Sequence, residues 1–148
     1  MDILVVEDDE VKRSRIISFL EETLDLTRLE IAKSFQSGMK AIVNNDFRLI
    51  ILDMTMPTFD INLYDDGGRP QAFAGREILF QMKRRKIYTP VIIVTQFHKF
   101  GENEEEMTIN ELNNELINAN LPMYKGIVYY NNALEGWKED LSILVNHI

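Results

Sequence analysis

The residues most able to do chemistry are polar side chains that stand directly after apolar runs. Glu7, Asp8 and Asp9 follow ILVV, Asp53 follows RLIIL, and Thr95 ends PVIIVT. Carboxylates gathered in one place repel each other by about 3 kcal/mol per pair at ~5 Å and an effective dielectric of about 20. A fold accommodates such a group when a cation lies among the carboxylates or when one of them takes up a proton.

The ligand types indicate a hard divalent cation. Glu7, Asp8 and Asp53 offer only oxygen atoms, and the chain has no cysteine. Mg²⁺ prefers oxygen ligands, keeps several waters and needs only one or two carboxylates. We therefore predict a Mg²⁺ site formed by these three residues. The alternative is that Asp8 and Asp9 only cap the following helix, a role that fits Asp9 because its side chain can accept from the free backbone N–H groups of a first helical turn.

The elements that must position these residues alternate between strands and helices. Apolar runs predict five strands, at 3–6, 27–34, 48–52, 90–95 and 126–130. Apolar spacings of three and four predict five helices, at 9–24, 34–44, 76–86, 108–121 and 133–148. The side chains expected to face the core from these helices are Ile16, Ile17, Leu20, Leu24, Phe35, Met39, Ile42, Val43, Ile78, Leu79, Met82, Ile109, Leu112, Leu116, Ile117, Leu134, Trp137, Leu141 and Leu144.

This alternation predicts the fold class. Five strand-then-helix units favour an α/β fold, with a parallel sheet covered by helices on both faces. Right-handed crossovers then favour a doubly wound five-stranded sheet, whose functional sites lie at the carboxyl ends of the strands. We therefore expect the acids after the first strand, Asp53 and Thr95 to share one edge of the sheet.

Composition limits the class of protein. A length of 148 residues, 45% hydrophobic and 27% charged, predicts a single globular domain over 1–148. The net charge of −8 argues against nucleic acid as a partner. No apolar run approaches the ~20 residues of a membrane span, so no membrane association is expected. The absence of cysteine is consistent with a cytoplasmic protein.

The stretches ILVVEDDE, FRLIILDMTMP and PVIIVT resemble, in order, spacing and placement, the receiver domain of response regulators in two-component signalling. The resemblance covers nearly the whole chain and implies a flavodoxin-like fold with strand order 2-1-3-4-5. It implies that Asp53 accepts a phosphoryl group from a phosphohistidine. By the same resemblance, Asp8 binds Mg²⁺ directly, Glu7 largely through water, and Thr55 through its backbone carbonyl, while Thr95 supplies the hydroxyl that responds to the phosphoryl group.

One residue of the family's pattern is missing. Receivers carry a lysine at the end of the fifth strand, which pairs with the phosphoryl oxygens, whereas this chain has Tyr130 or Asn131 there. Lys125 lies at the other end of that strand, about 16 Å away at ~3.3 Å per residue. Lys99, on a loop at the correct edge, is a candidate substitute; the alternative is an ordinary solvated lysine.

Two segments are longer than in a typical receiver. The segment 58–74 is polar and without periodicity, and it begins close to Asp53. It is either a lid or partner surface, or a disordered loop. The segment 96–121 begins with a charged connection that carries several glutamates and continues into a helix.

The function we predict is that of a stand-alone receiver-like signalling protein. It would take a phosphoryl group from a histidine kinase or phosphotransfer protein and act on a protein effector, without metabolic turnover. The alternative is a pseudo-receiver that binds its partner without phosphorylation. A haloacid-dehalogenase-like phosphatase is disfavoured, because Thr55 stands where those enzymes have a second acid.

Overall fold

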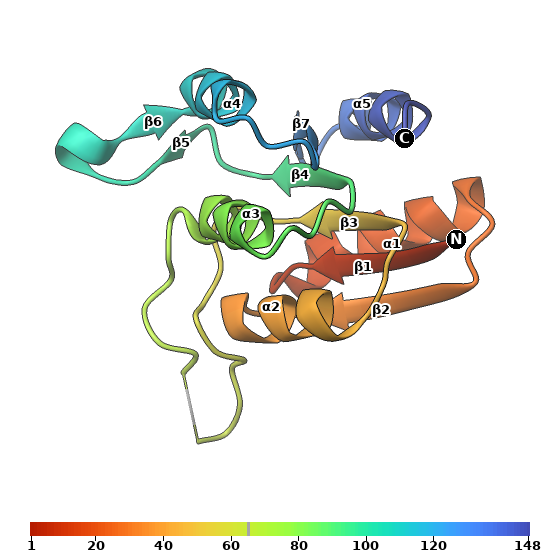
Figure 1. Ribbon diagram of the computed structural model, residues 1–148, viewed down its shortest axis with the longest axis horizontal. Coiled ribbons are helices and arrows are strands. Elements are labelled where there is room, and N and C mark those ends of the chain that lie inside the picture. The colour runs from red at the N-terminus through yellow and green to blue at the C-terminus, as the bar shows by residue number, and fades with distance from the viewer. Residues whose placement is uncertain (65) are drawn as a thin grey trace.

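The sheet has the predicted order. In the computed structural model, which describes residues 1–64 and 66–148, five parallel strands lie in the order β2-β1-β3-β4-β7 (Figure 1). Their bounds are Asp2–Val6 (β1), Arg28–Ala32 (β2), Leu49–Leu52 (β3), Val91–Thr95 (β4) and Tyr124–Tyr129 (β7). Since β7 is the fifth strand of this sheet along the chain, the predicted doubly wound α/β fold with order 2-1-3-4-5 is confirmed.

Helices cover both faces of the sheet. Their bounds are Glu10–Thr23 (α1), Phe35–Asn44 (α2), Ala74–Arg84 (α3), Ile109–Asn118 (α4) and Gly136–Val145 (α5). α1 and α5 pack on one face, and α2, α3 and α4 pack on the other (Figure 1). No helix in the described part of the chain is long and apolar enough to cross a membrane.

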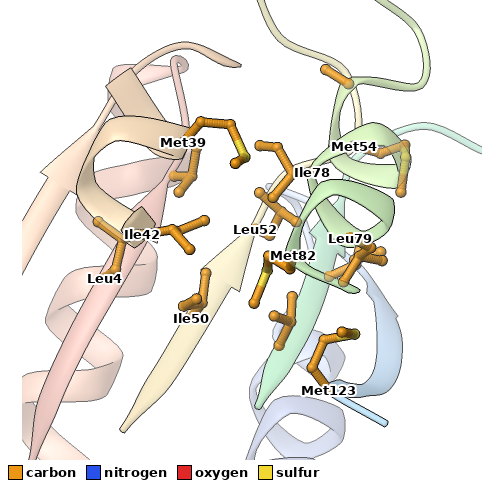
Figure 2. Packing of buried hydrophobic residues seen from close by; sticks show 14 of the residues in the cluster. Leu4, Met39, Ile42, Ile50, Leu52, Met54, Ile78, Leu79, Met82 and Met123 are labelled. Carbon is orange, nitrogen blue, oxygen red and sulfur yellow. The ribbon is translucent and has the colours of Figure 1, made fainter. Parts of the chain in front are cut away.

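The core explains why the central strands are apolar without interruption. Along β1 and β3 the side chains alternate between the two faces, and both faces are covered. Leu4, Ile50 and Leu52 contact the side chains of α2 and α3 (Figure 2), whereas Ile3 and Val5 contact those of α1 and α5. Packing on both faces fixes the position of these strands and therefore of their ends, where the candidate site lies.

Three of the side chains expected to face the core are instead exposed. Val43, Ile117 and Leu134 are 44%, 60% and 64% exposed. Val43 and Ile117 each follow a buried residue, and the 100° turn between neighbours in a helix carries them past the face that contacts the sheet. Leu134 precedes α5, which begins only at Gly136.

The connection after β4 holds structure that the sequence did not predict. β5 (Lys99–Phe100) and β6 (Met107–Thr108) form a small antiparallel hairpin, closed by the 3₁₀ turn η1 (Asn103–Glu105). Phe100 is buried, and its ring lies 6.3 Å from that of Phe73, which immediately precedes α3. From its charged residues alone, this segment would be expected to be a solvated loop. The apolar contact of Phe100 instead packs it against the domain.

The second long segment also leaves from the carboxyl edge of the sheet (Figure 1). A bridge between Met56 and Gln71 closes its base. The carbonyls of Pro57 and Thr58 accept from the backbone N–H groups of Phe35 and Gln36 at the start of α2. The base of the segment is thus hydrogen-bonded to the domain.

Candidate functional site

The register of the sheet brings the acids together. Val6 of β1 pairs with Leu52 of β3, so Glu7 and Asp53 are the next residues on adjacent strands. The N–H of Asp53 donates to the carbonyl of Val6 over 3.0 Å, which holds the two strand ends together. Oxygen atoms of Glu7, Asp8 and Asp53 lie within 4.8 Å of one another. The structure therefore gathers the three acids predicted to bind the metal in one cluster.

Burial makes this cluster electrostatically unfavourable by itself. Glu7 is 2% exposed and Asp53 4%, whereas Asp8 is half-buried. Burial, together with the charge of Asp53, raises the pKa of Glu7 to about 9. The same two causes raise the pKa of Asp8. The cluster therefore favours either a bound proton or a nearby cation.

A lysine that sequence reasoning missed supplies a positive charge. The Nζ atom of Lys12 lies 2.5 Å from Glu7 Oε1 and 3.1 Å from Asp53 Oδ1, and it donates to the carbonyl of Val94 over 2.7 Å. Burial alone would lower the pKa of Lys12, which is 1% exposed, but the carboxylates of Asp53 and Glu7 raise it above its usual value. Lys12 is thus a charged group inside the site.

The position of Lys12 in its helix is a signal that could have revealed this role. Asp9 caps α1 by accepting from the N–H of Lys12, so Lys12 lies in the first turn. The positive end of the helix dipole disfavours a cation there. Side chains in a helix also point toward its N-terminus, which in α1 is the end next to the acids. A first-turn lysine directly after an acidic run therefore predicts a specific anionic partner.

Arg13 fixes the backbone of the acidic turn. Its Nη1 atom donates to the carbonyl oxygens of Glu7 and Asp8, over 3.1 Å and 3.3 Å. The N–H of Asp9 also donates to Glu7 Oε2 over 3.1 Å. These bonds hold Glu7 and Asp8 at the strand end, and the sequence analysis had not assigned Arg13 a part in the site.

The carboxylate of Asp53 is held by its own neighbours. The N–H of Met54 donates to Asp53 Oδ1 over 2.8 Å, so this oxygen accepts from Met54 as well as from Lys12. Gly75, at the start of α3, passes so close that an added Cβ would lie 2.5 Å from the Asp53 carbonyl oxygen. Close packing against α3 therefore fixes the backbone that carries Asp53.

The two threonines occupy different surroundings. Thr95 is fully buried at the end of β4, and its hydroxyl accepts from the N–H of Phe97 over 3.2 Å. The hydroxyl of Thr55 donates to the carbonyl of Ala72 over 3.0 Å, which ties the two ends of the long segment together. The side chain of Thr55 is therefore engaged away from the acids, and only its backbone is available for the metal role that the resemblance implies.

An aromatic side chain directly follows β7, at one of the two positions that match the lysine of receivers. Tyr130 is 1% exposed, and its hydroxyl donates to Asn132 Oδ1 over 2.5 Å and accepts from Arg15 over 3.2 Å. Lys125 lies beside the first residues of β4, at the opposite end of the sheet. Lys99 is exposed on the hairpin, 3.6 Å from Glu106. Neither lysine lies in the acidic cluster.

The donor set fits a hard cation. Every side-chain atom that the cluster offers is a carboxylate oxygen, and the buried Glu7 Oε1 has Lys12 Nζ as its ion-pair partner. Oxygen-only ligand sets suit Mg²⁺. Glu7, Asp8 and Asp53 are thus chemically able to hold the ion, with Lys12 as the competing positive charge.

A groove of about 1030 Å³ is lined by residues of the long segment, α3 and the hairpin. Its lining includes Arg69 and Arg76 as well as glutamates 102, 104 and 105. None of the acids of the cluster, nor Thr95, lines the groove. The two long segments therefore form a surface that does not include the acidic cluster.

Comparison with known proteins gives one consistent result. The family model for the response regulator receiver domain matches residues 3–115. The Detocs response regulatory protein DtcB of Enterobacter cloacae is 33% identical over 141 residues, which cover 93% of this chain and 94% of that protein. The uncharacterized protein y4jR of Sinorhizobium fredii is 32% identical, covering 93% and 92% of the two chains.

Solved structures agree at the level of the fold. The receiver domain of the Francisella response regulator 1452 superposes with a TM-score of 0.63 at 20% identity, covering 99% of this chain and 93% of that one. The Thermotoga maritima response regulator TrrA, solved in complex with Mg²⁺ and BeF, gives 0.59 at 18% identity, covering 97% of both chains. The Mn²⁺-bound form of response regulator Rcp1 gives 0.63 at 20%, covering 97% and 90%.

Proposed function

Because this chain belongs to the response regulator receiver domain family, we propose that it accepts a phosphoryl group on Asp53 with Mg²⁺ held by Glu7, Asp8 and Asp53. The observation that carries the proposal is the cluster of three carboxylates, two of them buried, at the carboxyl edge of the sheet. The backbone carbonyl of Thr55 completes the proposed metal ligands, and the hydroxyl of Thr95 responds to the phosphoryl group. Residues 1–148 act together as one receiver domain in this proposal.

The chemistry requires positioning more than reactive groups. A carboxylate can attack phosphorus and form an acyl phosphate. When bound, Mg²⁺ neutralises charge on the transferring group. Hydrogen bonds from Met54 and Lys12 to Oδ1 hold the Asp53 carboxylate in one orientation. Arg13 holds the turn that presents the other two acids.

Receiver domains are signalling domains, and the partners follow from that role. We propose a histidine kinase or phosphotransfer protein as the donor and another protein as the downstream effector. The relative DtcB carries the name of a response regulatory protein, which supports a regulatory role for the chain. Signal output is therefore proposed to pass through protein–protein contact, with no metabolic turnover.

The decisive experiment is labelling by a small phosphodonor. The parent chain and Asp53→Asn are incubated with acetyl phosphate and Mg²⁺, and acid-labile phosphate is measured on each. Asp140→Asn, which changes an exposed aspartate on α5, is the matched control. We expect labelling of the parent and the control and none of Asp53→Asn. Equal labelling of all three chains would show that Asp53 is not the acceptor.

Tyr130 supports one second candidate, the pseudo-receiver that binds partners without phosphorylation. A buried aromatic ring directly follows β7, at one of the two positions that match the lysine of receivers. Titration with Mg²⁺ and with beryllofluoride, a phosphoryl mimic, separates the two functions. A chain that binds neither would be a pseudo-receiver, and a pulldown partner retained equally by the parent, Asp53→Asn and Asp53→Glu would lead to the same conclusion.

A further inference from the structure

We propose that Lys12 of α1 takes the place of the missing strand-end lysine, pairing with Asp53 before phosphoryl transfer and with a phosphoryl oxygen after it. The inference rests on the proposed function, in which Asp53 is the acceptor. It assigns the cation of the site to a different element of the fold, a helix on one face of the sheet in place of the end of the fifth strand.

The first observation that supports this role is the set of contacts that Lys12 makes. An ammonium group has three N–H donors, and the Nζ atom of Lys12 has three oxygen neighbours, on Glu7, Asp53 and Val94, all within 3.1 Å. These neighbours belong to the ends of three adjacent strands, β1, β3 and β4. The ammonium is therefore centred on the carboxyl edge of the sheet and directed at the acceptor.

The second observation is that neither β7 nor the residue that follows it places a basic side chain next to Asp53. The ring centre of Tyr130 lies 5.9 Å from Lys12 Nζ and 5.7 Å from the guanidinium carbon of Arg15. The nearby Arg15 is directed away from Asp53, toward Asn132 and Glu135. Across the described residues, Lys12 is the one basic side chain that forms an ion pair with Asp53.

The proposed phosphoryl transfer requires no proton from Lys12. Oδ2 of Asp53 attacks the phosphorus of a phosphohistidine or an acyl phosphate, and a new P–O bond forms. The P–N or P–O bond to the donor breaks, and its electron pair stays with the imidazole or the carboxylate that leaves. Lys12 remains an ammonium, keeps its bond to Val94, and transfers its contact from the carboxylate to an oxygen of the phosphoryl group.

The same geometry has a consequence for the metal. Lys12 pairs with Glu7 and Asp53, which are two of the three proposed Mg²⁺ ligands. Two cations that share these carboxylates repel each other and compete for the same oxygen atoms. Removing Lys12 should therefore strengthen Mg²⁺ binding even as it weakens phosphoryl transfer, a combination that an unfolded variant cannot give.

The test compares four chains: the parent, Lys12→Met, the double variant Lys12→Met/Tyr130→Lys, and Lys99→Met as the control on the exposed hairpin. Mg²⁺ affinity is measured by calorimetry, and the labelling rate from acetyl phosphate is measured at saturating Mg²⁺. We expect Lys12→Met to label about tenfold more slowly or worse, as for the loss of a charged hydrogen bond, and to bind Mg²⁺ at least as tightly as the parent. The double variant should recover part of the rate, because it restores a lysine at the end of β7, and Lys99→Met should match the parent.

Other outcomes separate this inference from the proposed function. If the parent labels and Lys12→Met labels at the same rate, Lys12 is not the phosphoryl cation, although Asp53 remains the acceptor. If Lys12→Met loses Mg²⁺ binding and labelling together, Lys12 only supports the fold of the acidic cluster, and the inference fails. A parent chain that does not label at all overturns the proposed function, and the inference falls with it.

Discussion

The two halves of the carboxyl edge of the sheet differ in what they keep of the receiver pattern. The half formed by β1 and β3 carries all three acids, with Glu7 and Asp53 buried at adjacent strand ends and Asp8 half-buried beside them. The half formed by β4 and β7 carries Thr95 but ends in Tyr130, which packs against Trp137 with ring centres 5.1 Å apart. The first half is an anionic cluster and the second an aromatic one.

In the proposed site, this difference means that a positive charge is kept while its position in the chain changes. A receiver site needs a positive group near the acceptor, because the phosphoryl oxygens carry negative charge. Here α1, which follows β1 directly, supplies Lys12 to the anionic half. The aromatic half is then free to pack Tyr130 against α5.

The largest expected effect concerns the proton on Glu7 in the anionic half. Burial and the charge of Asp53 raise its pKa from the usual 4.5 to about 9, against the opposing effect of Lys12. Between these values the folded protein binds more protons than the unfolded chain, so the free energy of unfolding falls as pH rises, by at most about 1.4 kcal/mol per pH unit. Lys12 stays charged throughout, since its own pKa is raised.

Denaturation of the metal-free protein in EDTA across this pH range measures the effect. Glu7→Gln, which imitates the protonated acid, should remove most of the fall. Parallel pH profiles for the parent and Glu7→Gln would show that Glu7 titrates normally. The buried acids of the anionic half would then not destabilise the fold as pH rises.

A smaller effect is expected at Gly75, which packs under the acceptor strand. A Cβ there would lie 2.5 Å from the Asp53 carbonyl oxygen and 3.0 Å from Met54 Cα, and neither backbone atom can move freely. We expect Gly75→Ala to lower the free energy of unfolding by about 1–3 kcal/mol and to slow labelling of Asp53. Gly136→Ala is the matched control, since a Cβ at Gly136 meets nothing within 4 Å.

Thermal melting and phosphodonor labelling of both glycine variants check this prediction. The control should be neutral or slightly stabilising, because alanine favours a helix more than glycine does. A Gly75→Ala variant as stable as the control would show that the anionic half is not fixed by its packing on α3.

The smallest effect is expected in the aromatic half. Tyr130→Phe keeps the ring but removes a hydroxyl that bonds Arg15 and Asn132. We expect a loss of about 1 kcal/mol in the free energy of unfolding and an unchanged labelling rate. Tyr88→Phe, at a half-exposed position, serves as the control. A large loss of labelling in Tyr130→Phe would place the tyrosine hydroxyl in the chemistry and blur the contrast between the two halves.

The sequence predicted those parts of the fold that depend on local pattern. Uninterrupted apolar runs marked the buried strands, and Asp9 marked a helix start that the structure confirms. It failed where the pattern was weak. The hairpin β5–β6 depends on the packing of Phe100 against Phe73, a contact between residues far apart in the chain.

For the candidate site, the order of strands in the sequence was enough to predict that the acids lie close together, because parallel strands end at one edge of the sheet. It was not enough to find the cation. Lys12 lies 41 residues from Asp53 and 82 from Val94 along the chain, and only the packing of α1 on the sheet brings these groups together. The sequence thus determined the negative charges, whose positions follow from strand ends, and the tertiary structure decided which positive charge meets them, because that depends on how a helix lies across several strands.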